Sequence, residues 1–361
     1  MPTPIFVRRS RSRAGLVGAL VDRAAPGDVV RPGLAALLDD LPRRLHRVPL
    51  PFLLGRRVRA AYGWEASDRT DEQWWPQGVT TADDARATGH APAGLGDRDV
   101  AVVTWYAKHD QGVRLTFVDL RSRRYRHVLL VTPVERYDGS VGLDPVKAHA
   151  GGIVWAGSWL HVAATGKGCV SAHLDDLLWL AHPRAVNRTF GHRWVLPTRV
   201  DHRGGADEGA AKLRWSFLSL DAGAGSATPT DADGPSVLVG EYGRGDASTR
   251  LARFPLQPDG RFLPDADDAR TTRAVEVVDA ALPGMQGVAA VDGRLHVTTS
   301  HGPWGPGSVH VRDGGGWTRT PAATPMGPED LSYSARTRSL WTPTEHPRRR
   351  WLVSLRPTYR A

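Results

Sequence analysis

Short apolar segments separated by glycine-containing turns recur along most of the chain. The clearest copy spans residues 149–164, where a glycine precedes a short apolar run, a tight turn and the tripeptide Leu-His-Val. A second copy spans 285–301, and its glycine again stands eight residues before the leucine of Leu-His-Val. Looser copies begin at 76–79 and at 328–331. Repetition of a short-strand unit in this way is typical of β-propeller blades.

The apolar runs within each repeat have the length and alternation of β-strands. Successive runs joined by turns predict antiparallel units of up to four strands. We expect strands near residues 77–81, 100–106, 113–120, 126–131, 152–156, 159–164, 169–174, 193–196, 214–220, 236–242, 249–256, 274–278, 287–291, 294–299, 307–312, 316–320, 331–334, 339–342 and 351–355. The sequence therefore predicts an all-β fold, a β-propeller of five four-stranded blades, or of six if the N-terminal arm supplies a whole blade.

The N-terminal arm differs from the repeats and predicts a short helical and irregular segment. Residues 31–42 have the pattern of a short amphipathic helix that ends at a proline. The last repeat lacks an outermost strand, and an unpaired sheet edge favours aggregation. We therefore expect a strand from residues 45–64 to pair with 350–356 and close the propeller. This divides the chain into an arm with the closing strand, residues 1–64, and a propeller domain, residues 65–361.

Charge and cysteine content exclude some classes of function. The formal charge is +9, from 47 basic and 38 acidic residues, and dense arginine clusters occur only near the two ends. No nucleic-acid recognition motif accompanies this charge, so a nucleic-acid partner is not expected. The single cysteine excludes an intrachain disulfide and a cysteine-based zinc site.

The sequence contains no apolar run of roughly 18 residues, the length that a transmembrane helix requires. Residues 14–21 resemble the apolar part of an export signal, but this run has only eight residues and is closed by Asp22 and Arg23. We therefore expect no cleavage and, for the chain as written, a cytoplasmic monomer.

Propeller geometry predicts which polar residues meet at one face. The start of each first strand and the end of each second strand lie at the same end of the central axis, which we call the axial mouth. We predict His149, Glu329 and His301 as catalytic residues, and Gln77, Gln286, Glu241, His346 and His109 as substrate-binding residues. Three of these histidines stand six residues after an apolar residue of a second strand, namely Val103, Leu295 and Leu340.

Carboxylates and histidines that converge in this way suit acid–base chemistry or the binding of a divalent metal, calcium or zinc. A structural explanation stands beside this one, because such residues also cap the exposed amides of neighbouring strands. Three functions remain open, of which the last is attachment to an acidic surface through the arginine-rich N-terminal arm. The first is an enzyme that acts on a small molecule at the axial mouth, as a lactonase-like hydrolase or as a cyclase or isomerase. The second is a non-catalytic binding module that presents this face to a glycan, a peptide or a protein.

Several segments, taken together, resemble a largely uncharacterised family of actinobacterial β-propeller-like proteins whose members often carry an export signal. These segments are 75–79, 118–120, 125–131, 149–155, 240–242, 285–287 and 327–331. The resemblance implies a propeller over residues 74–356, with a fold-level similarity to lactonase and strictosidine-synthase-like propellers, and it implies no activity. Relatives read Tyr-Val-Ala-Asp-Thr where this chain reads His-Val-Ala-Ala-Thr at 161–165, so one acidic residue is missing here.

Overall fold

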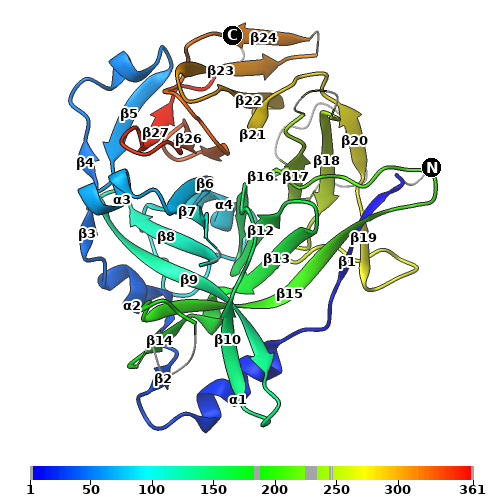
Figure 1. Cartoon of the computed structure of the whole chain (residues 1–361). Coiled ribbons are helices and arrows are strands. Elements are labelled where there is room, and N and C mark those ends of the chain that lie inside the picture. The colour runs from blue at the N-terminus through cyan, green and yellow to red at the C-terminus, as the bar shows by residue number, and fades with distance from the viewer. Residues whose placement is uncertain are drawn as a thin grey trace.

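Four hydrogen-bonded sheets make up most of the molecule, which we describe from a computed structural model (Figure 1). The structure describes residues 3–109, 111–182, 188–223, 234–243, 245, 247–314 and 316–358. The fold is all-β with a few short helices, as the sequence predicts, and the sheets fan out from a shared centre in the manner of a β-propeller. None of the helices in these ranges has the length and apolar character of a membrane span.

The largest sheet joins two antiparallel units edge to edge. Its main strands are β6 (Trp74–Thr81), β7 (Val100–Ala107), β8 (Val113–Asp119), β9 (Arg124–Glu135), β11 (Ile153–Ala156), β12 (Trp159–Ala164), β13 (Gly168–His173) and β15 (Trp194–Ala206). The outer strands β9 and β15 pair in parallel, with Leu130 opposite Leu196. Short strands β10 (Val141–Pro145) and β14 (Leu178–Leu180) extend its margins, and the turn η2 (Leu174–Asp176) precedes β14. The sequence predicts only the first part of β15, which continues as a strand to Ala206.

Three smaller sheets complete the arrangement. The first contains β16 (Phe217–Asp221), β17 (Ser236–Gly240), β18 (Arg250–Pro255) and β20 (Glu276–Asp279). The second contains β21 (Met285–Val291), β22 (Arg294–His301), β23 (Gly305–Arg312) and β24 (Trp317–Thr320). The third contains β25 (Ser332–Ser334), β26 (Ser339–Pro343), β27 (Trp351–Leu355), β5 (Val58–Gly63) and β4 (His46–Arg47). Each of these sheets is antiparallel throughout.

The innermost strands touch one another around the centre, and the recurring glycine marks the points of contact. Contacts link β6 to β11, β11 to β16, β16 to β21, β21 to β25 and β25 back to β6. A Cβ atom on Gly152 would lie 2.0 Å from the backbone nitrogen of Leu218, and one on Gly287 would lie 2.3 Å from that of Leu331. The spacing of the repeat therefore reflects backbone-to-backbone contact between neighbouring sheets, which leaves no room for a side chain.

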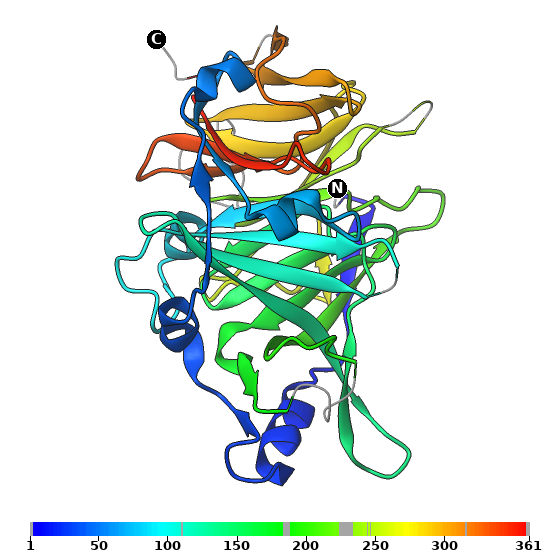
Figure 2. The same cartoon turned by 60° about the vertical axis from the view of Figure 1, so that its left-hand side comes forward.

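The N-terminal arm contributes strands to two sheets. Its elements are β1 (Ile5–Arg9), α1 (Ala14–Arg23), β2 (Val29–Val30), α2 (Gly33–Asp39), β3 (Arg43–Arg44) and η1 (Pro51–Leu54), followed after β5 by α3 (Ala66–Thr70). The arm runs along one side of the molecule, from α1 at one end to η1 at the other (Figure 2). The predicted pairing is present, because β5 pairs antiparallel with β27, with Ala61 opposite Val353. The sequence does not predict that β1 pairs with both β15 and β19 (Thr271–Arg273).

The close approach of the inner strands predicts a large effect of a small change. Gly152→Ala should lower the free energy of unfolding by about 2 kcal/mol or more, because the new methyl group overlaps the backbone of β16. Gly18→Ala in α1 is the matched control, since nothing lies within 4 Å of the added methyl group. This control should be neutral or stabilising by up to ~1 kcal/mol. Chemical denaturation measures both, and equal effects at the two positions would contradict the tight contact.

Candidate functional site

Two glutamates and two glutamines meet at the axial mouth. Gln77 lies in β6 and Gln286 in β21, while Glu329 precedes β25 and Glu345 follows β26. The amide Nε2 of Gln77 donates to Oε2 of Glu345 at 3.1 Å, and Nε2 of Gln286 lies 3.5 Å from Oε1 of Glu329. The Glu329 and Glu345 carboxyl groups lie close enough for each to shift the pKa of the other. We call Gln77, Gln286, Glu329 and Glu345 the axial carboxyl cluster.

The surroundings of the two carboxyl groups raise their pKa values unequally. Burial raises the pKa of Glu329 well above its ordinary value, and the neighbouring carboxylates of Glu345 and Asp330 raise it further. Burial also raises the pKa of Glu345, although the Gln77 amide and the nearby Lys108 charge oppose that shift. Glu329 is only 4% exposed and is the more strongly shifted of the two. Of the two carboxyl groups, Glu329 is therefore the one whose protonated form is favoured more strongly.

A tyrosine and a histidine stand over the cluster, stacked on each other. The ring centroids of Tyr106 and His149 are 4.4 Å apart, with an interplanar angle of 24°. Burial, together with the charges of Glu345 and Glu329, raises the pKa of Tyr106 to about 12. The His149 ring is open to solvent, yet the surrounding protein desolvates it enough to lower its pKa. At neutral pH the site thus presents a neutral phenol and a neutral imidazole.

Cations and aromatic rings surround the outer carboxylate. The Lys108 ammonium lies 3.6 Å from the ring centroid of Trp75, a cation–π contact. Nδ1 of His346 lies 3.7 Å from Oε1 of Glu345, and its ring meets Trp75 edge-on. Nε of the buried Arg350 donates to the Glu345 backbone carbonyl at 2.7 Å. These groups favour the ionised form of Glu345 over that of Glu329.

Asp330 lies beside the cluster and ties three inner strands together. Its Oδ2 accepts from the backbone N–H of Val79 at 3.1 Å and of Ile153 at 3.3 Å. Asp330 occupies the position that glycine holds in β6, β11 and β21, so its side chain reaches into the centre of the propeller. It is completely buried, and burial raises its pKa well above the ordinary value. This carboxyl group is a structural bridge between sheets.

The structure brings together five of the residues predicted from the sequence. Gln77, Gln286 and Glu329 belong to the axial carboxyl cluster, while His149 and His346 adjoin it through Tyr106 and Glu345. Sequence reasoning selected neither Tyr106 nor Glu345 as a site residue. Glu345 does stand at the end of a second strand beside His346, and this position could have identified it.

Glu241 and His301 have other partners. Glu241 forms an ion pair with Arg250 at 2.9 Å and accepts from the backbone N–H of Arg214 at 2.8 Å. The exposed His301 bonds Ser308 at 2.9 Å and lies 3.3 Å from a nitrogen of Arg319. Among the described residues, the hydrogen bonds and ion pairs of Glu241 and His301 do not reach the axial carboxyl cluster.

The expected equivalence of His109 with the other two rim histidines is wrong. In the strand pairing, Ala101 occupies the position equivalent to Leu295 and Leu340, the leucines six residues before His301 and His346. Val103 does not occupy that position. Val103 instead lies opposite the residue directly after the β6 glycine. His109 therefore stands two residues beyond the corresponding position, where it is exposed.

A metal site was one chemistry that the sequence left open. Within the described ranges, no group of three or more His, Cys, Asp or Glu side chains is arranged to hold a metal ion.

The pKa shifts predict that the contributions of Glu329 and Glu241 to the free energy of unfolding depend on pH in opposite directions. Because the folded-state pKa of Glu329 is raised, its contribution to stability is present below the ordinary value of 4.5 and is lost as pH rises above it. Glu329→Gln keeps the shape and cannot ionise, so this variant should be more stable than wild type at pH 7–8. Each unit by which the pKa is raised corresponds to ~1.4 kcal/mol in the free energy of unfolding. The stability difference between Glu329→Gln and wild type should vanish near pH 4.

Glu241→Gln is the matched control for that measurement. Burial alone would raise the pKa of Glu241, but hydrogen bonds from Arg250 and Ser248 lower it overall. Its contribution to stability is therefore present above the ordinary value and is lost as pH falls, so the variant should be less stable than wild type at neutral pH. Denaturant unfolding of both variants across pH measures the signs, and a destabilised Glu329→Gln at pH 8 would contradict the buried protonated carboxyl.

Comparisons with known proteins do not assign the chain to a family. No protein-family model matches the sequence, and no curated protein does. A gluconolactonase from Xanthomonas campestris is 15% identical, with a TM-score of 0.37 over 91% of this chain and 90% of that one. The β-propeller domain of Cps50 (Swd1) from Myceliophteria thermophila is 10% identical, with a TM-score of 0.37 over 87% of this chain and 100% of that one.

A glutaminyl cyclase from Myxococcus xanthus is also similar, at 10% identity and a TM-score of 0.31 over 78% of this chain and 93% of that one. Identities and scores this low carry no argument about activity. What can be said about function must come from the geometry of the chain's own residues.

Proposed function

We propose that the protein is an enzyme that acts on a small polar molecule at the axial mouth by general acid–base catalysis. The observation that carries this proposal is the meeting of two carboxyl groups, Glu329 and Glu345, each within reach of a glutamine amide at the axial mouth. Two carboxyl groups whose environments separate their pKa values supply both an acid and a base at one pH. A lactonase-like hydrolysis, a cyclisation or an isomerisation would each use such a pair.

The roles follow from which carboxyl group is ionised. Glu345, the more exposed and ionised partner, takes a proton from the attacking water or substrate hydroxyl. Glu329, the protonated partner, gives its proton to the oxygen atom that leaves or is enolised. A proton transfer from Glu345 to Glu329 then restores the starting state. The neutral Tyr106 phenol can donate to a substrate carbonyl, and the amides of Gln77 and Gln286 orient the two carboxyl groups.

We further infer that the antiparallel units form five blades of a closed propeller. The inner strands contact one another in a complete cycle, and β5 supplies the outer strand of the unit that begins at β25. Closure of this kind removes the open edge between the first unit and the last. Closure also brings the starts of the inner strands into one ring, and the axial carboxyl cluster is built from residues near these starts. A closed propeller agrees with the actinobacterial propeller-like proteins that the sequence resembles.

A non-catalytic binding module is the second candidate. The deep burial of Glu329 and Asp330 favours it, because their hydrogen bonds also serve to hold neighbouring sheets together. Such a module would bind at the axial mouth without turnover, and its affinity would depend on the exposed rim more than on the buried carboxyl groups.

Turnover of a panel of lactones, with amino-terminal glutamine peptides as cyclisation substrates, tests the enzyme proposal. With any substrate that is turned over, Glu329→Gln and Glu345→Gln should each lower kcat/KM by about 10²–10⁴-fold, the usual worth of a general acid or base. His301→Ala and His109→Ala should stay within about twofold of wild type, because neither residue contacts the cluster. Binding without turnover in wild type would favour the binding module, and turnover that survives both glutamine variants would refute the assigned roles.

A further inference from the structure

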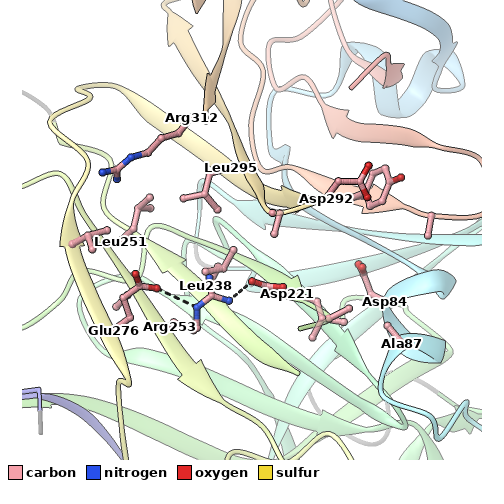
Figure 3. Close-up of a pocket in the computed structure, with 18 of the residues that line it drawn as sticks. Asp84, Ala87, Asp221, Leu238, Leu251, Arg253, Glu276, Asp292, Leu295 and Arg312 are labelled. Atoms are coloured by element: carbon pink, nitrogen blue, oxygen red, sulfur yellow. Dashed lines mark hydrogen bonds and ion pairs between the residues drawn. The ribbon is translucent and has the colours of Figure 1, made fainter. Parts of the chain in front are cut away.

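A second concave site lies at the other end of the inner strands. This cavity, of about 510 Å³, lies between the sheet of β16–β20 and the sheet of β21–β24 (Figure 3). Asp221 ends β16 and Asp292 follows β21, and both line the cavity. The axial carboxyl cluster instead lies where these inner strands begin. The two sites are therefore separated by the length of the strands.

Unequal filling of the space between the two sheets leaves this cavity open. Large apolar side chains, including Phe217 and Met285, fill the part nearest the strand starts. Toward the strand ends the facing positions are small, with Ala252 on one sheet and Ala290 on the other. The apolar walls come from Leu220, Leu238, Leu251, Val278 and Leu295. A volume of this size lies within the range of ~300–1,000 Å³ typical of small-molecule sites.

The charge of the lining is opposite to that of the whole protein. Five acidic residues and two arginines line the cavity, in a chain whose formal charge is +9. Arg253 neutralises two of the acids, since it forms ion pairs with Asp221 and with Glu276. Asp83 is paired with Arg86 at 3.3 Å. The acids left without a cationic partner among the described residues are Asp84 and Asp292.

Asp84 presents an unused oxygen to the cavity. The residue is only 7% exposed, and its Oδ2 accepts from the hydroxyl groups of Thr80 at 2.7 Å and of Ser332 at 2.8 Å. The backbone N–H of Thr81 donates to the same oxygen at 3.1 Å. Oδ1 has no partner in the described part of the chain, although Asp84 lines the cavity. These three bonds hold the carboxyl group at the start of α4 (Ala82–Ala87) while its second oxygen stays available.

We propose that this cavity binds a small organic amine that carries one positive charge on an apolar body. The ammonium group would lie between Asp84 and Asp292, and the apolar body would lie along the leucines. Figure 3 shows Asp84 and Asp292 toward one end of the cavity and Arg312 with Leu251 toward the other, with Leu238 and Leu295 between them. The Arg312 guanidinium makes the far end unfavourable for a second cation, so a monocation fits better than a diamine.

Three isosteric probes test the proposal, namely 3-phenylpropylamine, 3-phenylpropan-1-ol and 3-phenylpropanoate. Titration calorimetry or NMR at neutral pH should find that the amine binds at least about tenfold more tightly than the alcohol, because it gains charge-assisted hydrogen bonds. The carboxylate should bind most weakly. A protein of net charge +9 repels cations at long range, so preference for the amine would report on the cavity itself.

Two variants locate the binding and separate its charged and apolar parts. Ala290→Leu places extra atoms in the cavity and should lower the affinity for all three probes about tenfold or more. Asp292→Asn keeps the left-handed backbone, with φ at 48°, which asparagine tolerates. Asp292→Asn should lower the affinity for the amine about fivefold and leave the affinity for the alcohol unchanged. Asp138→Asn, in the exposed turn between β9 and β10, is the matched control and should change nothing.

Each outcome decides for or against the amine site. Equal affinities for the three probes, or no binding of the amine at about 10 mM, would overturn the proposal. Binding that survives Ala290→Leu would place the amine elsewhere and would overturn it too. Glu329→Gln should leave amine affinity unchanged, so the result is independent of the fate of the proposed enzyme.

Discussion

Close contact between the inner strands is the constraint on which the rest of the molecule depends. Where β6, β11 and β21 meet their neighbours, glycine is present because a Cβ atom would overlap the adjoining backbone. Just before β25, the residue at the corresponding position is Asp330. Its side-chain Oδ2 accepts backbone N–H groups from β6 and β11. One buried side chain thus satisfies donors of two strands of the largest sheet, at a point where strands crowd too closely for most residues.

This arrangement has an electrostatic consequence next to the bridge. Asp330 and Glu329 are adjacent in sequence, so a carboxyl group placed at the centre for structural reasons raises the pKa of its neighbour. Glu329 gains a proton because burial and two nearby carboxylates all disfavour its charge. Glu345 keeps its charge more readily because it lies nearer to Lys108 and Arg350. The difference between the two glutamates therefore arises from their surroundings, since their intrinsic chemistry is identical.

The two ends of the inner strands differ in how they are filled. At the axial mouth, polar side chains from several sheets bond one another. At the opposite end, small residues on two facing sheets leave a cavity with apolar walls and an acidic end. Because the sheets diverge from the centre, the space between two neighbours depends on the size of a few facing side chains. Function at either end can therefore change through a few residues without disturbing the contacts at the centre.

The sequence by itself determined the strands and their grouping, because alternating apolar residues and a glycine at fixed spacing are local signals. It also determined that residues 45–64 must supply a strand, since the last repeat lacks one and a sheet edge requires a partner. Only the tertiary structure decided which rim residues meet, because contact depends on strand register and on the path of each connection. Glu345 and Tyr106 joined Glu329 in this way, whereas His109, two residues out of register, and His301 did not. The pairing of β1 with β15 and the cavity beside Asp84 likewise arise from packing between segments far apart in the chain, for which a linear pattern carries no signal.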